Sequence, residues 1–289
     1  MLNWIRKRSL FVIMILMLFL IVSNSGVFAQ DKSDTDKSIT TPIEEINLSD
    51  QDSLTTEHIV RSSFDVEDHD IHMTVAPTWR NYKKYDGSNN KTSIPTLIRA
   101  DIARDWELWV LSDTYTKQYP KTGFNDVAAG IKWQFSEKNP SQALYGGVRF
   151  NTASCNVGDG ATEPRVAYLL DYKINDKWML SANITWAYLY DGVVFQRYNQ
   201  LAYAAQATYN LNKRSQFVLI GSSSCPDNSP TWWKGVNVMS ATAGYVNLIN
   251  KDTNWGVYVT KGLSPIDINW LYTLGATFKI GEWKQYIKH

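Results

Sequence analysis

Residues that could carry out chemistry are few in this chain and lie far apart. The four histidines are His58, His69, His72 and His289, and the first two fall in an acidic N-terminal stretch. A serine hydrolase needs a histidine base beside its nucleophile, and only His72 falls where strands are expected. No glycine-rich phosphate loop occurs, and no cluster has metal-ligand spacing. The sequence therefore predicts no enzyme, no catalytic residue, no metal site and no cofactor.

Charged residues at alternating positions are the second chemical feature. Between Asp126 and Phe135, apolar side chains occupy every second position, and Lys132 belongs to the polar series between them. Such a period of two indicates a β-strand with two different faces. We assign ten charged residues to the polar face, five basic and five acidic: Arg99, Asp101, Glu107, Asp113, Asp126, Lys132, Arg149, Arg165, Asp171 and Lys173. Two interpretations stay open, ion pairs that cross-link a narrow barrel or a constriction that a solute passes.

Alternating segments of this kind also determine the fold class. Segments about ten residues long, apolar on one face and polar on the other, are typical of transmembrane β-barrels. A secreted β-sandwich alternates too, but its core would not accept so many charges and amides. Aromatic residues gather at segment ends, as in interfacial girdles, and 12 Trp and 16 Tyr exceed the 10 Phe. The sequence predicts an all-β fold, an antiparallel transmembrane β-barrel.

We expect twelve strands, with ten or fourteen left open because three of the segments alternate poorly. The predicted strands span residues 72–80, 94–103, 106–116, 125–135, 143–153, 164–174, 178–190, 200–211, 214–222, 234–246, 253–261 and 267–280. Tight turns such as Arg104–Asp105 alternate with longer connections such as 81–93. Short turns face the periplasm in these barrels and longer loops face outward. About eight strands leave an interior filled by side chains and about sixteen leave an aqueous channel, so we expect a narrow or plugged pore.

The N-terminal residues predict export and a linker. Basic residues at positions 6–8 precede an apolar run from Leu10 to Val22, and Val27-Phe28-Ala29 offers a cleavage site. This pattern predicts a signal peptide over residues 1–29, because the run is shorter than the ~20 residues that span a membrane. Residues 30–70 hold twelve acids against three bases, a charge of −9. We expect a disordered acidic periplasmic linker there, and the barrel over residues 71–289.

Net charge and cysteine content add two further expectations. A formal charge of +1 argues against a nucleic-acid partner held by a basic field. Cys155 and Cys225 both fall in predicted outer loops of an oxidising compartment. A disulfide between them is one hypothesis, and the distance between the loops decides it.

The last predicted strand carries a pattern of its own. Residues 273–280 read polar-x-Gly-x-x-aromatic-x-apolar, and nine more residues follow. The pattern resembles the last-strand signal by which the outer-membrane assembly machinery recognises its substrates.

Two stretches carry a family resemblance. Residues 95–110 read PTLIRADIARDWELWV and residues 123–133 read GFNDVAAGIKW. They resemble the MetA-pathway of phenol degradation family of outer-membrane transporters, more loosely across residues 72–280. The family motif positions are occupied by Arg99, Glu107, Gly123, Asp126, Gly130 and Lys132. The family usually has a glycine soon after the arginine, where residues 100–102 are Ala-Asp-Ile. The family name does not establish a phenolic substrate.

The expected function follows from the barrel and from the resemblance. We expect an outer-membrane channel or transporter of a Gram-negative bacterium that passes small solutes, apolar ones among them, down a gradient. Its partners would be outer-membrane lipid, an unidentified small-molecule solute and the assembly machinery. The alternative hypothesis is a barrel that is not a channel and acts as a surface interaction or structural protein through outer loops such as 82–93 and 223–234.

The family positions also predict a charged network across one hairpin. We expect Arg99 and Glu107 to face each other, with Asp126 and Lys132 nearby. Simple register around the turn at 104–105 places Glu107 opposite Ile102. Direct contact between Arg99 and Glu107 therefore needs a register shift or the long reach of arginine. We therefore expect a wider network that includes Lys132 or Arg149.

Alternating connection lengths give a test of orientation. A cysteine label at Ser88 or Gln196 should react from outside intact cells, because both lie in predicted outer connections. A label at Asn212, in a tight predicted turn, should not react. The opposite pattern would reverse the orientation and contradict the even strand count.

Overall fold

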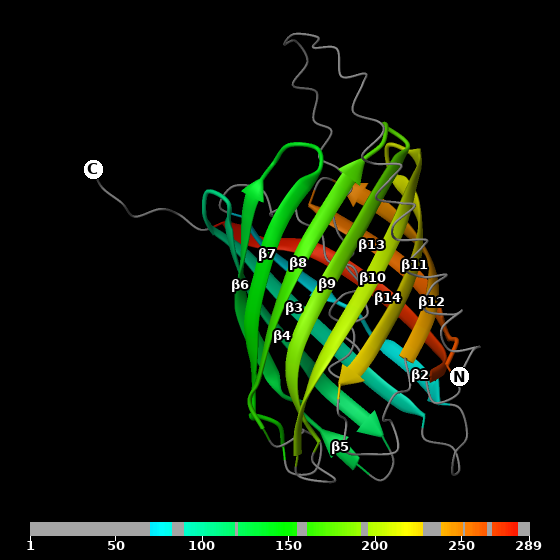
Figure 1. The fold of residues 1–289 in the computed structure, drawn as a ribbon. Helices are drawn as coiled ribbons and strands as arrows, with labels where there is room; N and C mark the ends of the chain where they lie inside the picture. Colours follow the sequence, from blue (N-terminus) through cyan, green and yellow to red (C-terminus); the bar gives the residue numbers. More distant parts are fainter. Residues whose placement is uncertain are drawn as a thin grey trace, which may run out of the picture. The chain divides into compact units, whose positions relative to one another are not determined.

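Twelve antiparallel strands close into a barrel in the computed structural model (Figure 1). The structure describes residues 70–82, 90–118, 121–154, 161–191, 196–227, 238–250, 252–264 and 268–282. Within these ranges no helix is long and apolar enough to cross a membrane. The predicted signal peptide and nearly all of the predicted linker lie outside them, so both stay predictions.

Fourteen strand segments build these twelve barrel strands. They are β1 (Asp70–Val75), β2 (Thr78–Tyr82), β3 (Lys91–Ala103), β4 (Trp106–Gln118), β5 (Lys121–Gly123), β6 (Val127–Ser136), β7 (Ser141–Phe150), β8 (Glu163–Lys173), β9 (Trp178–Asp191), β10 (Gln196–Asn212), β11 (Ser215–Asp227), β12 (Val238–Asn250), β13 (Thr253–Gly262) and β14 (Ile268–Glu282). β1 and β2 form one barrel strand, because both pair with β14 on one side and β3 on the other. β5 and β6 likewise form one barrel strand, because both pair with β4. The predicted count of twelve is confirmed.

Two prolines explain the break between β1 and β2. Ala76 N–H donates to Pro95 O over 2.9 Å, and Leu274 N–H donates to Pro77 O over 3.1 Å. Neither proline has an N–H to return the second bond of its pair. The barrel strand therefore continues through Ala76 and Pro77, with one backbone hydrogen bond to each neighbouring strand where two would normally form.

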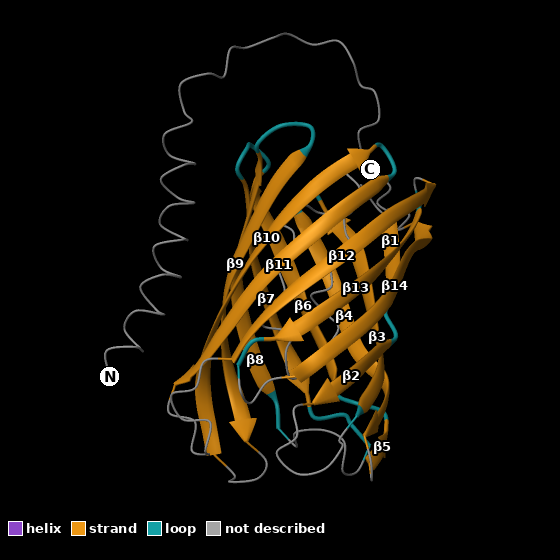
Figure 2. Cartoon of the chain, turned by 90° about the vertical axis from the view of Figure 1, so that its right-hand side faces the viewer, coloured by secondary structure: helices purple, strands orange, loops and turns teal. Residues whose placement is uncertain are grey.

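The ring closes where the first barrel strand, β1 and β2, lies beside the last strand, β14 (Figure 2). Side-chain contacts reinforce this seam. The hydroxyls of Thr74 on β1 and Thr277 on β14 lie 2.8 Å apart. Lys279 Nζ lies 2.7 Å from Asp70 Oδ1. With both neighbours present for every strand, the sheet has no open edge along its length, which a membrane-spanning sheet requires.

Several loop-end boundaries differ from the predicted ones. The turn end carries short connections such as Arg104–Asp105, and the loop end carries the longer connections. β11 continues to Asp227, so Cys225 lies on a strand opposite Leu201 and not in a loop. Gln196 begins β10 instead of lying in a connection. Polar residues at the start of β10 and serines near the end of β11 continue the ladder without continuing the apolar alternation. Cys155 lies outside the described residues, so the disulfide stays a prediction.

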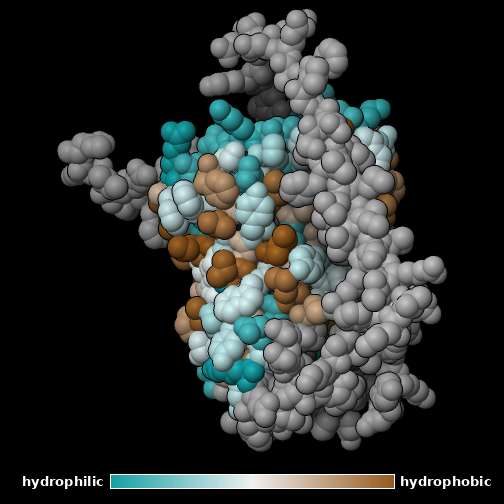
Figure 3. All heavy atoms as spheres, viewed as in Figure 1, coloured by the Kyte–Doolittle hydropathy of each residue, from teal (hydrophilic) through white to brown (hydrophobic). Residues whose placement is uncertain are grey.

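The outward face has aromatic residues near both ends and aliphatic residues between them. Near the turn end, Trp106 stacks on Trp133 at 5.7 Å between ring centroids. Near the loop end, Trp79 stacks on Tyr272 at 5.4 Å. The visible outward surface is apolar across its middle and hydrophilic at the turn end (Figure 3). Exposed aliphatic residues between the girdles include Leu144, Val166, Ile184, Leu219, Val257 and Leu274. This arrangement suits a hydrocarbon layer bounded by two interfaces.

Depth within that layer gives a test of the membrane-facing surface. Leu219 is 60% exposed at mid-strand, and Ile249 is 56% exposed at the turn end of β12. A lysine costs about 2–4 kcal/mol at the bilayer midplane and about 0–1 near an interface. Leu219→Lys should therefore lower the free energy of unfolding from lipid vesicles far more than Ile249→Lys. Equal losses in denaturant titrations would contradict the assigned membrane depth.

Candidate functional site: the barrel interior

Charge is unevenly distributed around the inner wall. Among the described residues, the buried charged side chains lie on β1 to β8 or just before β6, six basic and six acidic. They are Arg80, Lys91, Arg99, Lys132, Arg149 and Arg165, with Asp70, Asp101, Glu107, Asp126, Glu163 and Asp171. The buried polar side chains of β9 to β14 are hydroxyls and amides, among them Asn183, Thr185, Gln200, Thr208, Ser222, Thr260 and Thr273. One half of the interior therefore carries equal numbers of buried basic and acidic side chains, and the buried polar side chains of the other half are uncharged.

A buried ionic cluster lies toward the turn end. Glu107 Oε2 accepts a hydrogen bond from Lys132 Nζ at 3.1 Å, and Arg99 Nη1 lies 3.6 Å from the same oxygen. A β-bulge at Ile102 places Asp101 opposite Glu107, while Arg99 lies opposite Trp109. The register shift brings Arg99 one residue closer, and its long side chain covers the remaining distance to Glu107. Glu107 and Lys132 are direct partners across β4 and β6. Arg99 and Lys132 thus share one carboxylate and cross-link three strands.

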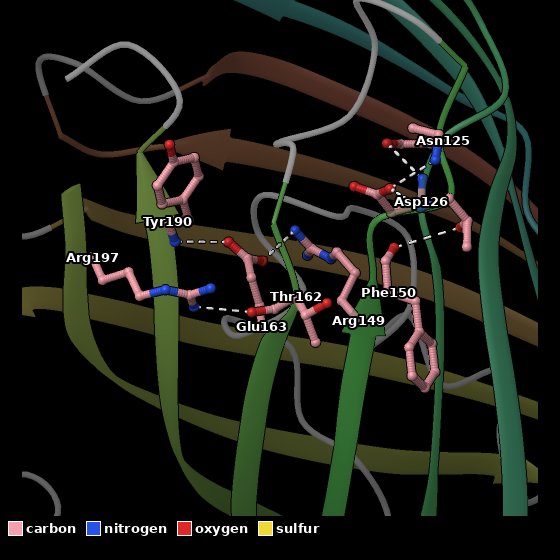
Figure 4. A network of polar contacts seen from close by, with 10 residues as sticks. Asn125, Asp126, Arg149, Phe150, Thr162, Glu163, Tyr190 and Arg197 are labelled. Atoms are coloured by element: carbon pink, nitrogen blue, oxygen red, sulfur yellow. Dashed lines mark hydrogen bonds and ion pairs between the residues drawn. The ribbon is translucent and has the colours of Figure 1, made fainter. Parts of the chain in front are cut away.

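A second polar network lies at the loop end (Figure 4). Arg149 Nη1 donates to Glu163 Oε2 at 2.8 Å, and the Tyr190 N–H donates to Glu163 Oε1 at 2.9 Å. Glu163 therefore joins β7, β8 and β9. The arginine and carboxylate are direct register partners, so the ion pair needs no long reach.

Asp126 acts in this second region and not in the turn-end cluster, where we had expected it. Its Oδ1 accepts hydrogen bonds from the N–H groups of Thr152 and Ala153, both at 2.8 Å. The Asp126 N–H in turn bonds to Asn125 Oδ1 at 2.9 Å (Figure 4). The family-motif aspartate therefore fixes the backbone that follows β7.

Two apolar clusters lie on the inner wall. On the charged half, Trp109 stacks on Tyr145 with ring centroids 4.5 Å apart. The rest of this first cluster is Leu97, Leu111, Ala128, Ala143, Ala167 and Leu169. The second cluster, on the neutral half, consists of Ala204, Val218, Ile220, Val246 and Tyr258.

Hydroxyl pairs connect the strands of the neutral half. Ser222 and Ser240 oxygens lie 2.7 Å apart, as do those of Thr242 and Thr260. Each pair joins direct register partners. Cross-strand hydroxyl pairs of this kind stabilise a sheet without placing charge inside it.

Eight of the ten predicted interior charges are buried inside the barrel: Arg99, Asp101, Glu107, Asp126, Lys132, Arg149, Arg165 and Asp171. The placement of Lys173 was wrong. Its side chain is 57% exposed, and its Nζ lies 3.0 Å from Asp176 Oδ1. Alternation assigns Lys173 to the inward face, but β8 ends at this residue, so the side chain lies at the turn. The side chain of Asp113 lies outside the description. The role of these residues in transport stays a proposal.

Four buried charges escaped the sequence analysis, for identifiable reasons. Asp70 was assigned to the linker, one residue before the predicted start of the barrel. Glu163 precedes Pro164, where the predicted strand began, although it shares its parity with Arg165. Lys91 lies before the predicted start of β3, and Arg80 lies in a segment whose alternation is weak. If the alternation of inward and outward residues had been continued two residues beyond each predicted strand boundary, Glu163 would have been assigned to the inward face. Among the described residues, no group of three or more His, Cys, Asp or Glu is arranged to hold a metal ion.

Comparisons with known proteins agree with this architecture. A family model described as "Putative MetA-pathway of phenol degradation" matches residues 59–275. The comparison with curated proteins finds no match. An outer-membrane channel from Pseudomonas putida F1 is 12% identical and similar over 75% of this chain and 100% of its own, with a TM-score of 0.53. The NanC porin, also 12% identical, is similar over 72% of this chain and 100% of its own, with a TM-score of 0.55. Both have the outer-membrane barrel fold.

The shared carboxylate at the turn end gives a stability test. Glu107→Gln would leave Lys132 and Arg99 without the carboxylate that both contact. Removing one partner of a fully buried ion pair costs about 3–5 kcal/mol, so thermal unfolding should occur at a clearly lower temperature. Asp176→Asn removes the partner of the exposed Lys173 and should leave unfolding unchanged. Equal unfolding temperatures for Glu107→Gln and the parent would mean that water solvates these charges.

Proposed function

Because the chain belongs to the MetA-pathway of phenol degradation family and folds as a closed outer-membrane barrel, we propose that it is a passive channel for small solutes. The single observation that carries the proposal is the difference between the two faces of its wall. The outward face is apolar between aromatic girdles, and the inward face is polar and charged. A sheet with these faces separates lipid from a polar interior.

The inner wall also favours a class of solute. Among the described residues, six buried bases are matched by six buried acids, so these side chains provide no net charge that would attract ions of one sign. Closely paired groups such as Arg149 and Glu163 compensate each other within the wall. The channel therefore suits small solutes without net charge, apolar ones included, and the sequence offers no motif for coupling to an energy source.

The alternative, a barrel that acts only through its outer loops, has no support of this kind. It depends on residues 82–93 and 223–234, and most of these lie outside the described part of the chain. We assign no reaction to the protein.

Conductance of the purified full-length protein in planar bilayers tests the channel. We expect discrete steps in KCl, and a reversal potential near zero in a salt gradient because the described interior charges balance. Heat-unfolded protein from the same preparation is the matched control. Absence of steps from folded protein would contradict the channel, and a large reversal potential would contradict the neutral-solute preference.

A further inference from the structure

Two aromatic side chains of the inner wall lie in notches left by glycines. Trp109 on β4 is the register partner of Gly130 on β6, and Gly130 is the partner of Gly147 on β7. A Cβ atom added at Gly130 or at Gly147 would overlap Cζ2 of the Trp109 indole. The Trp109 side chain is only 1% exposed. The indole therefore fills the space beside Gly147, whereas an added Cβ at Gly130 would meet the backbone oxygen of Gly146 before it met the ring.

Tyr258 repeats this arrangement on the other half of the barrel. It is the register partner of Gly244 across β13 and β12, and it is 2% exposed. A Cβ atom at Gly244 would overlap Cδ1 and Cε1 of the Tyr258 ring, and all three of its nearest atoms belong to that ring. The notch at Gly244 is thus specific to the aromatic side chain and leaves the backbone undisturbed.

The two notches lie on opposite sides of the closed ring. Trp109 and its glycines belong to the adjoining strands β4, β6 and β7, whereas Tyr258 and Gly244 belong to β13 and β12. Strands β8 to β11 separate them in one direction, and β14, the β1–β2 strand and β3 in the other. Each ring is also a member of one of the two inner apolar clusters.

We infer that these glycine notches hold Trp109 and Tyr258 against opposite walls and thereby set the bore of the channel. The inference rests on the proposed channel function. A ring without its notch has to rotate away from the wall, because side chains occupy discrete rotamers and an added Cβ at Gly244 would overlap the Tyr258 ring. The direction left to it is the lumen. Glycine is needed at these positions because an aromatic ring lies where a Cβ atom would be, as for other strand glycines near a bulky neighbour.

A purely structural role makes a different prediction. Aromatic rings that cover glycines stabilise sheets, and loss of that contact would change unfolding without changing the bore. Conductance separates the two roles, because it depends on the open cross-section and not on stability.

Gly244 offers the sharpest test, since the three atoms nearest to an added Cβ there all belong to the Tyr258 ring. We expect Gly244→Ala to lower single-channel conductance by roughly twofold, because conductance follows the cross-section of the pore. Tyr258→Ala should raise conductance above that of the parent. In the Tyr258→Ala background, Gly244→Ala should have no further effect, because the ring that the methyl displaces is gone. Gly221→Ala is the matched control, since a Cβ there meets nothing within 4 Å.

The outcomes are distinguishable. Folding of each variant is checked by its heat-dependent migration on gels, and Tyr258→Ala tests the inference even if Gly244→Ala does not fold. If neither Tyr258→Ala nor Gly244→Ala changes the conductance, the inference is wrong, but the channel function is not contradicted. A fall on Gly244→Ala that persists without the Tyr258 ring also overturns it. A folded parent protein that does not conduct overturns the channel and the inference together.

Discussion

The hydrogen-bonding demand of the backbone is the constraint on which the rest of this structure depends. Hydrocarbon offers no partner to an N–H or C=O group, so a sheet within it has to close on itself. Here β14 closes on the interrupted first strand, and the ladder continues past Pro77 and Pro95 with single bonds where two would normally form. The Thr74–Thr277 and Asp70–Lys279 contacts reinforce that seam.

Closure gives every strand an inside and an outside, and the charges inside follow from that. A buried charge without a partner is far more costly than one that is paired. The interior meets this demand locally, since Glu107 and Lys132 are register partners, and so are Arg149 and Glu163. Sharing of Glu107 by Lys132 and Arg99 extends the same principle to a third strand. Balance across the charged half is thus built from contacts between neighbouring strands.

The face of the sheet to which each side chain points could be predicted from the sequence, because alternation is a local property of an extended chain. Alternation around Lys132 assigns its face without knowledge of any partner strand, and the same holds for Arg165 and Asp171. Register could not be predicted in this way. The bulge at Ile102 changes which residue faces Glu107, and nothing in the alternation of either strand alone requires it.

Strand ends were the other source of error, because parity has meaning only while the strand continues. Lys173 has inward parity but lies where β8 turns, so its ammonium group reaches solvent. Glu163 shows the reverse case, since β8 begins one residue before Pro164 and places that carboxylate beside Arg149. The end of a strand depends on where its neighbours' loops close, which is a property of the assembled barrel.

Glycines show most clearly what parity leaves undetermined. Gly146 and Gly147 are adjacent in sequence, yet a Cβ at Gly146 would meet nothing and one at Gly147 would overlap the Trp109 ring. Alternation explains why they face opposite ways, but the need for glycine at 147 comes from a side chain two strands away. The shape of the interior is therefore determined by pairs of residues, one contributing bulk and its partner contributing the absence of a side chain. A change at a residue without a side chain can accordingly alter the lumen as much as a change at the aromatic residue that faces it.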